Sequence, residues 1–259
     1  MKLRDALPAL VSFGNMGCGF GAIICVFGQR FEYAGWLIIL ATVLDAFDGK
    51  VARIANSTSK FGSQLDSLAD LVTFGVAPAI MIGRICTEIS PIIVWGVGFF
   101  FAVCAAVRLA RFSCESETHA TGTKSALGGL AACDPVEASH QTFTGLPTTS
   151  AGGAIASLLI LNAYLHTRFG TDAVLIFLPA AVFILAILMI CKVRYTHAKV
   201  FFTAKQHGTV PFLLEAVSAT LFFVFCPQVT VSAAFCFYAI SGLLGLLKGK
   251  VFTRQLDPA

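Results

Sequence analysis

Long runs of apolar residues, separated by short polar segments, follow one another along almost the whole chain. Most runs have the length that an α-helix needs to cross the hydrocarbon core of a bilayer, about 20 residues. In a bilayer, backbone polar groups must bond within their own segment, so these runs are expected to be helices. They lie at about residues 6–28, 34–44, 65–82, 92–109, 146–165, 173–191, 210–226 and 229–247.

This pattern predicts an all-α fold, a polytopic transmembrane helical bundle with six to eight spans, of which eight fit best. Only Pro227 and Gln228 separate the last two runs, which predicts an extra C-terminal helical hairpin at about 208–248. We find no internal repeat and no separate soluble domain. Residues 1–259 are therefore expected to form one integral membrane domain, with the core at about 1–190.

Composition supports this interpretation. Of the 259 residues, 57% are hydrophobic and 12% are charged, which excludes a soluble protein of this size. The net charge of +4 is spread between apolar runs and does not indicate nucleic-acid binding. Most of the nine cysteines lie in or beside apolar runs without a C-x2-C pair, so we interpret them as packing residues. The first run lacks a clear cleavage site and is read as a retained helix.

The distribution of basic residues predicts the orientation. With eight spans, all of the 18 Lys and Arg residues except Arg30, Arg84 and Arg168 fall on one side of the membrane. Cytoplasmic loops carry the excess of Lys and Arg, which places both termini in the cytoplasm. We therefore expect a multi-pass protein of the cell membrane whose polar segment at 54–61 faces the cytoplasm.

One stretch interrupts the apolar pattern with four carboxylates, Asp45, Asp48, Asp66 and Asp70. Within each pair the residues are three or four positions apart, so they share one helix face. The polar segment 54–61 is typical of a short turn, which would bring the two helices together as antiparallel neighbours with the pairs facing each other. Ionisable groups are costly inside membrane segments, so they usually mark a functional site.

Four carboxylates in one cavity repel one another, and a divalent cation such as Mg²⁺, bound together with substrate phosphates, relieves this repulsion. Gly49 and Gly62 allow close approach of a ligand, and Arg53 at the helix end can reach a phosphate. These residues predict a site for a pyrophosphate and a metal. The alternative is a set of charges that anchor helices at the membrane edge, but carboxylates do not gain there as Lys and Arg do.

The spacing D-x2-D-G-x2-A-R-x8-G-x3-D-x3-D over residues 45–70 resembles the signature of the CDP-alcohol phosphotransferase family. The resemblance implies a membrane enzyme whose four aspartates hold one or two Mg²⁺ or Mn²⁺ ions. It also implies that Asp70 is the general base. The residues expected to border the nucleotide and pyrophosphate are Gly49, Ala52, Arg53 and Gly62.

Three further segments, D-S-L-A-D-L-V-T-F-G-V-A-P-A, R-L-A-R-F and F-x-G-L-P, are similar to the phosphatidylserine synthase branch of this family. Thr73 stands where that branch usually has Ser, and Thr148 and Thr149 replace its Ser-Pro. The branch implies transfer of a phosphatidyl group from CDP-diacylglycerol to L-serine. Arg108 and Arg111 are candidate contacts for the serine carboxylate, because a guanidinium suits a carboxylate, although positive-inside anchoring explains them equally well.

Other functions stay open on the sequence alone. Glycerol 3-phosphate, inositol phosphate or choline can replace serine in the same chemistry. An ion-coupled transporter also uses intramembrane carboxylates, but it normally shows repeat symmetry or helices broken at the midplane. A structural scaffold needs no group of four carboxylates. The expected partners are the two substrates and membrane lipid, with a possible homodimer and no nucleic acid.

Overall fold

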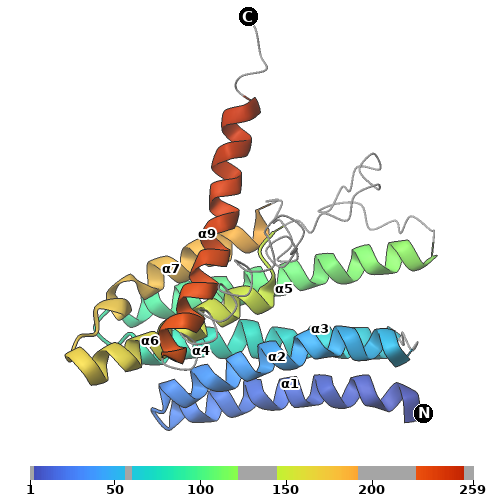
Figure 1. The fold of residues 1–259 in the computed structure, drawn as a ribbon, viewed down its shortest axis with the longest axis horizontal. Coiled ribbons are helices and arrows are strands. Elements are labelled where there is room, and N and C mark those ends of the chain that lie inside the picture. The colour runs from blue at the N-terminus through green and yellow to red at the C-terminus, as the bar shows by residue number, and fades with distance from the viewer. Residues whose placement is uncertain (1–2, 56–59, 122–144, 192–225, 254–259) are drawn as a thin grey trace, which may run out of the picture.

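A computed structural model of the chain describes residues 3–55, 60–121, 145–191 and 226–253. Every regular element in these ranges is helical, and Figure 1 shows their arrangement. The elements are α1 (Leu3–Phe27), α2 (Phe31–Ala55), α3 (Lys60–Asp70), η1 (Leu71–Val76), α4 (Ala77–Ile85), α5 (Pro91–Thr121), α6 (Thr148–Phe169), α7 (Ala173–Ile190) and α9 (Pro227–Thr253).

The predicted fold class is confirmed, since each apolar run within the described ranges forms a helix. In these ranges, five helical segments are long and apolar enough to cross a membrane. They are Leu10–Phe27, Gly62–Ile85, Pro91–Ser113, Thr148–Phe169 and Ala173–Ile190. The run 210–226, which would form the first half of the predicted hairpin, lies outside the described residues. The total of eight spans therefore stays a prediction.

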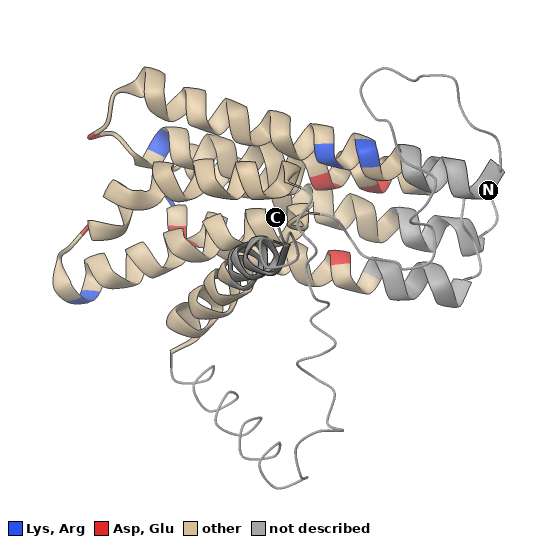
Figure 2. Cartoon of the chain, turned by 90° about the horizontal axis from the view of Figure 1, so that it is seen from above, with Lys and Arg blue, Asp and Glu red and all other residues tan. Residues whose placement is uncertain are grey.

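The helices from α1 to α7 run side by side along the long axis of the bundle, and α9 rises steeply across them (Figure 1). Among the described residues, the charged ones fall into two groups along the bundle, and uncharged helix separates the groups (Figure 2). Helix α1 packs against both α2 and α3, and α6 packs against α2, α7 and α9. In lipid, such contacts depend on close packing and interhelical hydrogen bonds rather than on the hydrophobic effect.

The segment from Lys60 to Ile85 is one continuous helix with a wider, π-helical stretch, η1, in its middle. There, the N–H of Ala77 donates to the carbonyl of Val72, five residues earlier. Pro78 follows directly, and it lacks the N–H that would bond four residues back in an α-helix. Such stretches are frequent at functional sites. Here it begins one residue after Asp70.

Candidate functional site

Three of the four predicted carboxylates meet in space. Asp45 comes from α2, and Asp66 and Asp70 come from α3. One carboxylate oxygen from each of the three lies within 4.8 Å of the others. Asp70 is almost fully buried, with 9% of its surface exposed, and Asp45 and Asp66 are half-buried. Figure 2 shows acidic residues close together on neighbouring helices.

This cluster has the donor set of a site for a hard divalent cation. Two unit charges about 5 Å apart repel by roughly 3 kcal/mol at an effective dielectric constant of about 20. Three ionised carboxylates at this separation are therefore unstable unless positive charge compensates them. Oxygen ligands on converging helices suit Mg²⁺ or Mn²⁺. The residues present fit the metal that the sequence predicts.

Helix α1 supplies polar contacts that the sequence analysis missed. The Nδ2 atom of Asn15 donates to Oδ1 of Asp70 at 2.9 Å, and the hydroxyl of Ser12 donates to Oδ1 of Asp66 at 3.4 Å. Thr73 in η1 donates in turn to the backbone carbonyl of Asn15 at 3.1 Å. Asn15 is fully buried, and its Oδ1 atom has no hydrogen-bond partner among the described residues. Ser12 and Asn15 lie one turn apart in an otherwise apolar helix, and this spacing could have indicated from the sequence that both face a polar site.

Arg108 lies on the α5 side of the cluster. Its Nη1 atom donates to the hydroxyl of Thr148 at 2.7 Å, and its guanidinium interacts electrostatically with Asp70. The Nε atom is buried and has no hydrogen-bond partner in the part of the chain that the structure describes. Arg111, one turn further along α5, is exposed. The contacts described for α5 therefore bring Arg108, and not Arg111, to the carboxylates.

The G-L-P motif explains how Thr148 reaches Arg108. Gly145 has a φ of +95°, a backbone conformation that favours glycine, and Pro147 immediately precedes the first residue of α6. The motif thus turns the chain into α6 and places Thr148 at the beginning of that helix. Thr73 and Thr148, two positions where the sequence departs from the branch it resembles, both use their hydroxyls in hydrogen bonds beside the cluster.

The remaining predicted residues are only partly described. Asp48 lies one turn after Asp45 on α2, and its side chain lies outside the described residues. The same holds for the side chains of Ala52 and Arg53, and Gly49 follows Asp48 on the same helix. Gly62 lies on α3, one turn before Asp66. The predicted turn at 54–61 falls mainly outside the described residues. The nucleotide contacts stay predictions.

The comparisons with known proteins agree with this geometry. The family model for CDP-alcohol phosphatidyltransferase matches residues 5–247. The chain is 29% identical over 245 residues to a CDP-diacylglycerol–serine O-phosphatidyltransferase from Helicobacter pylori, covering 92% of this chain and 89% of that one. For the enzyme of that name from Bacillus subtilis, the identity is 29% over 193 residues, with coverages of 74% and 91%.

An archaeal relative is also similar. The chain is 32% identical over 192 residues to an archaetidylserine synthase from Methanothermobacter thermautotrophicus, covering 73% of this chain and 69% of that one. The family match includes every helix that contributes to the carboxylate cluster, since it begins in α1 and ends in α9. The chain belongs to the CDP-alcohol phosphatidyltransferase family.

Proposed function

We propose that this protein is a CDP-diacylglycerol–serine O-phosphatidyltransferase of phospholipid biosynthesis. It transfers the phosphatidyl group of CDP-diacylglycerol to the hydroxyl of L-serine and releases CMP. The observation that carries the proposal is the group of Asp45, Asp66 and Asp70 with the half-buried Arg108 beside it, in a membrane-embedded bundle. The names of the relatives from Helicobacter pylori and Bacillus subtilis support serine as the acceptor.

Asp45, Asp66 and Asp70 hold one or two Mg²⁺ or Mn²⁺ ions in this proposal, and Asp48 joins them from the next turn of α2. The bound metal supplies positive charge to the diphosphate and to the departing CMP. The residues that border the nucleotide and the diphosphate are Gly49, Ala52, Arg53 and Gly62. In this arrangement the acyl chains of CDP-diacylglycerol stay in the lipid bilayer, and its cytidine diphosphate lies at the carboxylate cluster.

The guanidinium of Arg108 binds the carboxylate of serine, because a planar pair of N–H donors matches two carboxylate oxygens. Asp70 accepts the proton of the serine hydroxyl as general base. The hydroxyl oxygen then forms a bond to the phosphorus that carries diacylglycerol, and the bond from that phosphorus to CMP breaks. Asn15 holds the Asp70 carboxylate in position through its hydrogen bond of 2.9 Å.

The protein lies in the cell membrane with this site facing the cytoplasm, where the cytidine nucleotide is available. The bias of Lys and Arg toward one side supports this orientation. We also propose from the sequence that residues at about 1–190 form the catalytic core. A homodimer is a further part of the proposal.

The test uses purified protein in detergent with CDP-diacylglycerol and either Mg²⁺ or Mn²⁺. CMP release is followed while serine, glycerol 3-phosphate, inositol phosphate and choline are offered separately. We expect release that requires both serine and the metal. Release with another acceptor would keep the site and discard serine as the substrate. Absence of release with all four, from protein that is folded, would overturn the enzymatic function and favour an ion-coupled transporter.

A further inference from the structure

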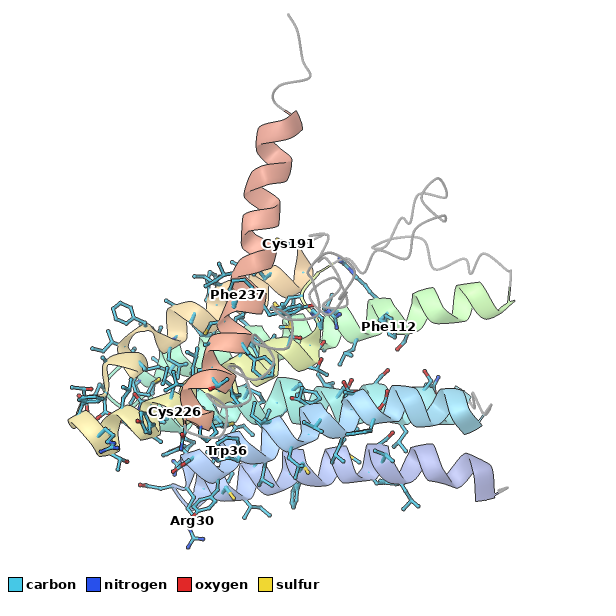
Figure 3. The ribbon with its side chains drawn as sticks, in the orientation of Figure 1. Arg30, Trp36, Phe112, Cys191, Cys226 and Phe237 are labelled. Carbon is cyan, nitrogen blue, oxygen red and sulfur yellow. The ribbon has the colours of Figure 1, made fainter. Side chains whose placement is uncertain are left out.

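Helix α9 is fixed on α6 by two specific contacts. The hydroxyl of Ser232 donates to the backbone carbonyl of Ser157 at 2.6 Å, and both residues are buried. One turn later, the ring of Phe235 packs against Gly153, where an added Cβ would lie 2.6 Å from the ring's Cζ atom. Only a residue without a side chain allows this approach. Figure 3 shows the part of α9 between Cys226 and Phe237 that crosses the bundle here.

These contacts define the direction of α9 relative to α6. As α9 advances from Ser232 to Phe235, its partner on α6 moves back from Ser157 to Gly153. One more turn of each helix brings Tyr238 level with the first residues of α6, which begins at Thr148. Tyr238 is half-buried and packs against the core. The register therefore brings its ring to the place where Thr148 binds Arg108.

The electrostatics of Arg108 agree with this placement. Besides Asp70, the phenol group of Tyr238 lies close enough to this guanidinium for the charge of one group to affect the other. The arginine side chain is long and flexible, and any rotation that is still free before the substrate binds must be lost on binding, at a cost in entropy. Several partners that hold the guanidinium in one orientation reduce this cost. Thr148 supplies one partner from α6, and Tyr238 supplies another from α9.

We propose that Tyr238 is a positioning residue for the acceptor, which acts by holding the guanidinium of Arg108 in the orientation that receives the acceptor carboxylate. The inference rests on the proposed function, in which Arg108 binds serine. It also extends the acceptor site beyond residues 1–190, since a helix from the C-terminal part of the chain then shapes it.

The test compares the Tyr238→Phe variant, which removes only the hydroxyl, with the control Phe237→Leu. Phe237 is the neighbouring residue on α9 and is 59% exposed. CMP release is measured against the concentration of serine and, separately, of CDP-diacylglycerol. Loss of the hydroxyl beside the guanidinium is expected to raise the KM for serine about 3–10-fold, with the KM for CDP-diacylglycerol and the melting temperature unchanged. The control should match wild type.

A second comparison tests whether Tyr238 acts through Arg108. In an Arg108→Lys background, Tyr238→Phe should have little further effect on the KM for serine, because the guanidinium it holds is already gone. An unchanged KM for serine in Tyr238→Phe would overturn the inference. Equal rises in both KM values, or a lower melting temperature, would also overturn it in favour of a merely structural role.

Failure of the proposed function has a different signature. In that case wild-type protein itself would release no CMP in response to serine. If only the Tyr238 inference fails, wild-type protein shows serine-dependent release and the Tyr238→Phe variant has the same KM for serine.

Discussion

Two polar clusters lie at different levels along the same helical bundle, and they differ in how their charges are balanced. In the first cluster, well inside α2 and the helix from Lys60 to Ile85, Asp45, Asp66 and Asp70 place carboxylate oxygens within 4.8 Å of one another. In the second cluster, Asp172 is a single acid, 51% exposed, beside the end of α6. Its Oδ1 atom lies 3.2 Å from Nδ1 of His166 and accepts a hydrogen bond of 3.2 Å from Asn162.

A structural role explains the second cluster, because Asp172, just before α7, contacts His166 and Asn162 of α6. A structural role does not explain the group of three carboxylates. Its described hydrogen-bond donors, Ser12 and Asn15, are neutral, and the guanidinium of Arg108 interacts with one of the three acids, Asp70. Polar residues in an apolar chain thus do not by themselves indicate function. Several side chains of the same charge, brought together from different helices, are the better indication of a functional site.

The largest expected effect comes from removing divalent cations. With excess EDTA, CMP release should fall to background. Without the divalent cation, no positive charge offsets the repulsion between the three carboxylates and the diphosphate of the substrate. Addition of Mg²⁺ or Mn²⁺ should restore the release, and the circular dichroism spectrum should stay helical throughout. Full activity in the presence of EDTA would show that the carboxylate cluster needs no metal, and this difference between the two clusters would disappear.

The Asp70→Asn variant should lower kcat by roughly 10²- to 10⁴-fold, because it removes the group that accepts the serine proton. Binding of CDP-diacylglycerol should persist. Asp172→Asn makes the same chemical change in the second cluster and serves as the matched control. It should retain kcat within about twofold, since exposed pairs contribute little. Near-normal turnover of Asp70→Asn would exclude this residue as the base.

Arg108→Lys should raise the KM for serine about tenfold, because an ammonium cannot replace the two parallel hydrogen bonds of a guanidinium. Serine titrations at saturating CDP-diacylglycerol measure this effect. Arg111→Lys is the control and should change the KM less, because Arg111 is exposed. Equal effects of the two variants would restore the two-arginine site that the sequence predicts.

Asn15→Ala should lower kcat up to about tenfold, because Oδ1 of Asp70 loses a buried hydrogen-bond donor. Ser12→Ala should have a smaller effect, since its bond to Asp66 is long at 3.4 Å. Steady-state kinetics with both substrates distinguish the two variants. A larger effect of Ser12→Ala would show that Asp66, and not Asp70, depends on α1 for its position.

The smallest effect is expected at the second cluster. His166→Ala removes a side chain that is 62% exposed, and exposed ion pairs contribute about 0–1 kcal/mol. The melting temperature in detergent and the serine-dependent rate should both stay close to wild type. A strong loss of activity would contradict the purely structural role of this cluster.

The helices of the described ranges, and the meeting of carboxylates from two of them, could be predicted from the sequence for physical reasons. Apolar runs of membrane length must be helical, and spacings of three and four residues place Asp66 and Asp70 on one face. The convergence of Asp45 with this pair followed from the short connection between the two helices.

The contacts of Asn15 and Tyr238 did not follow from the sequence. Periodicity identifies the face of a helix on which a residue lies, but not which other helix covers that face. Asn15 is 55 residues from Asp70 along the chain, and α9 lies beyond a segment outside the described residues. The same limit made Arg108 and Arg111 look equivalent, because a spacing of three cannot show that one side chain is exposed.

The π-helical stretch from Leu71 to Val76 also constrains how this chain can change. A π-helical turn is equivalent to an α-helix with a residue inserted, and each residue turns an α-helix by about 100°. Deleting one residue between Asp70 and Pro78 would therefore let the widened turn close into a regular α-helix, and α4 would keep nearly the same rotation relative to the carboxylates. A one-residue deletion within α4 has no such turn to absorb it and would rotate the residues after it by about 100° relative to the carboxylates, so a deletion should be better tolerated in the π-helical stretch than in α4.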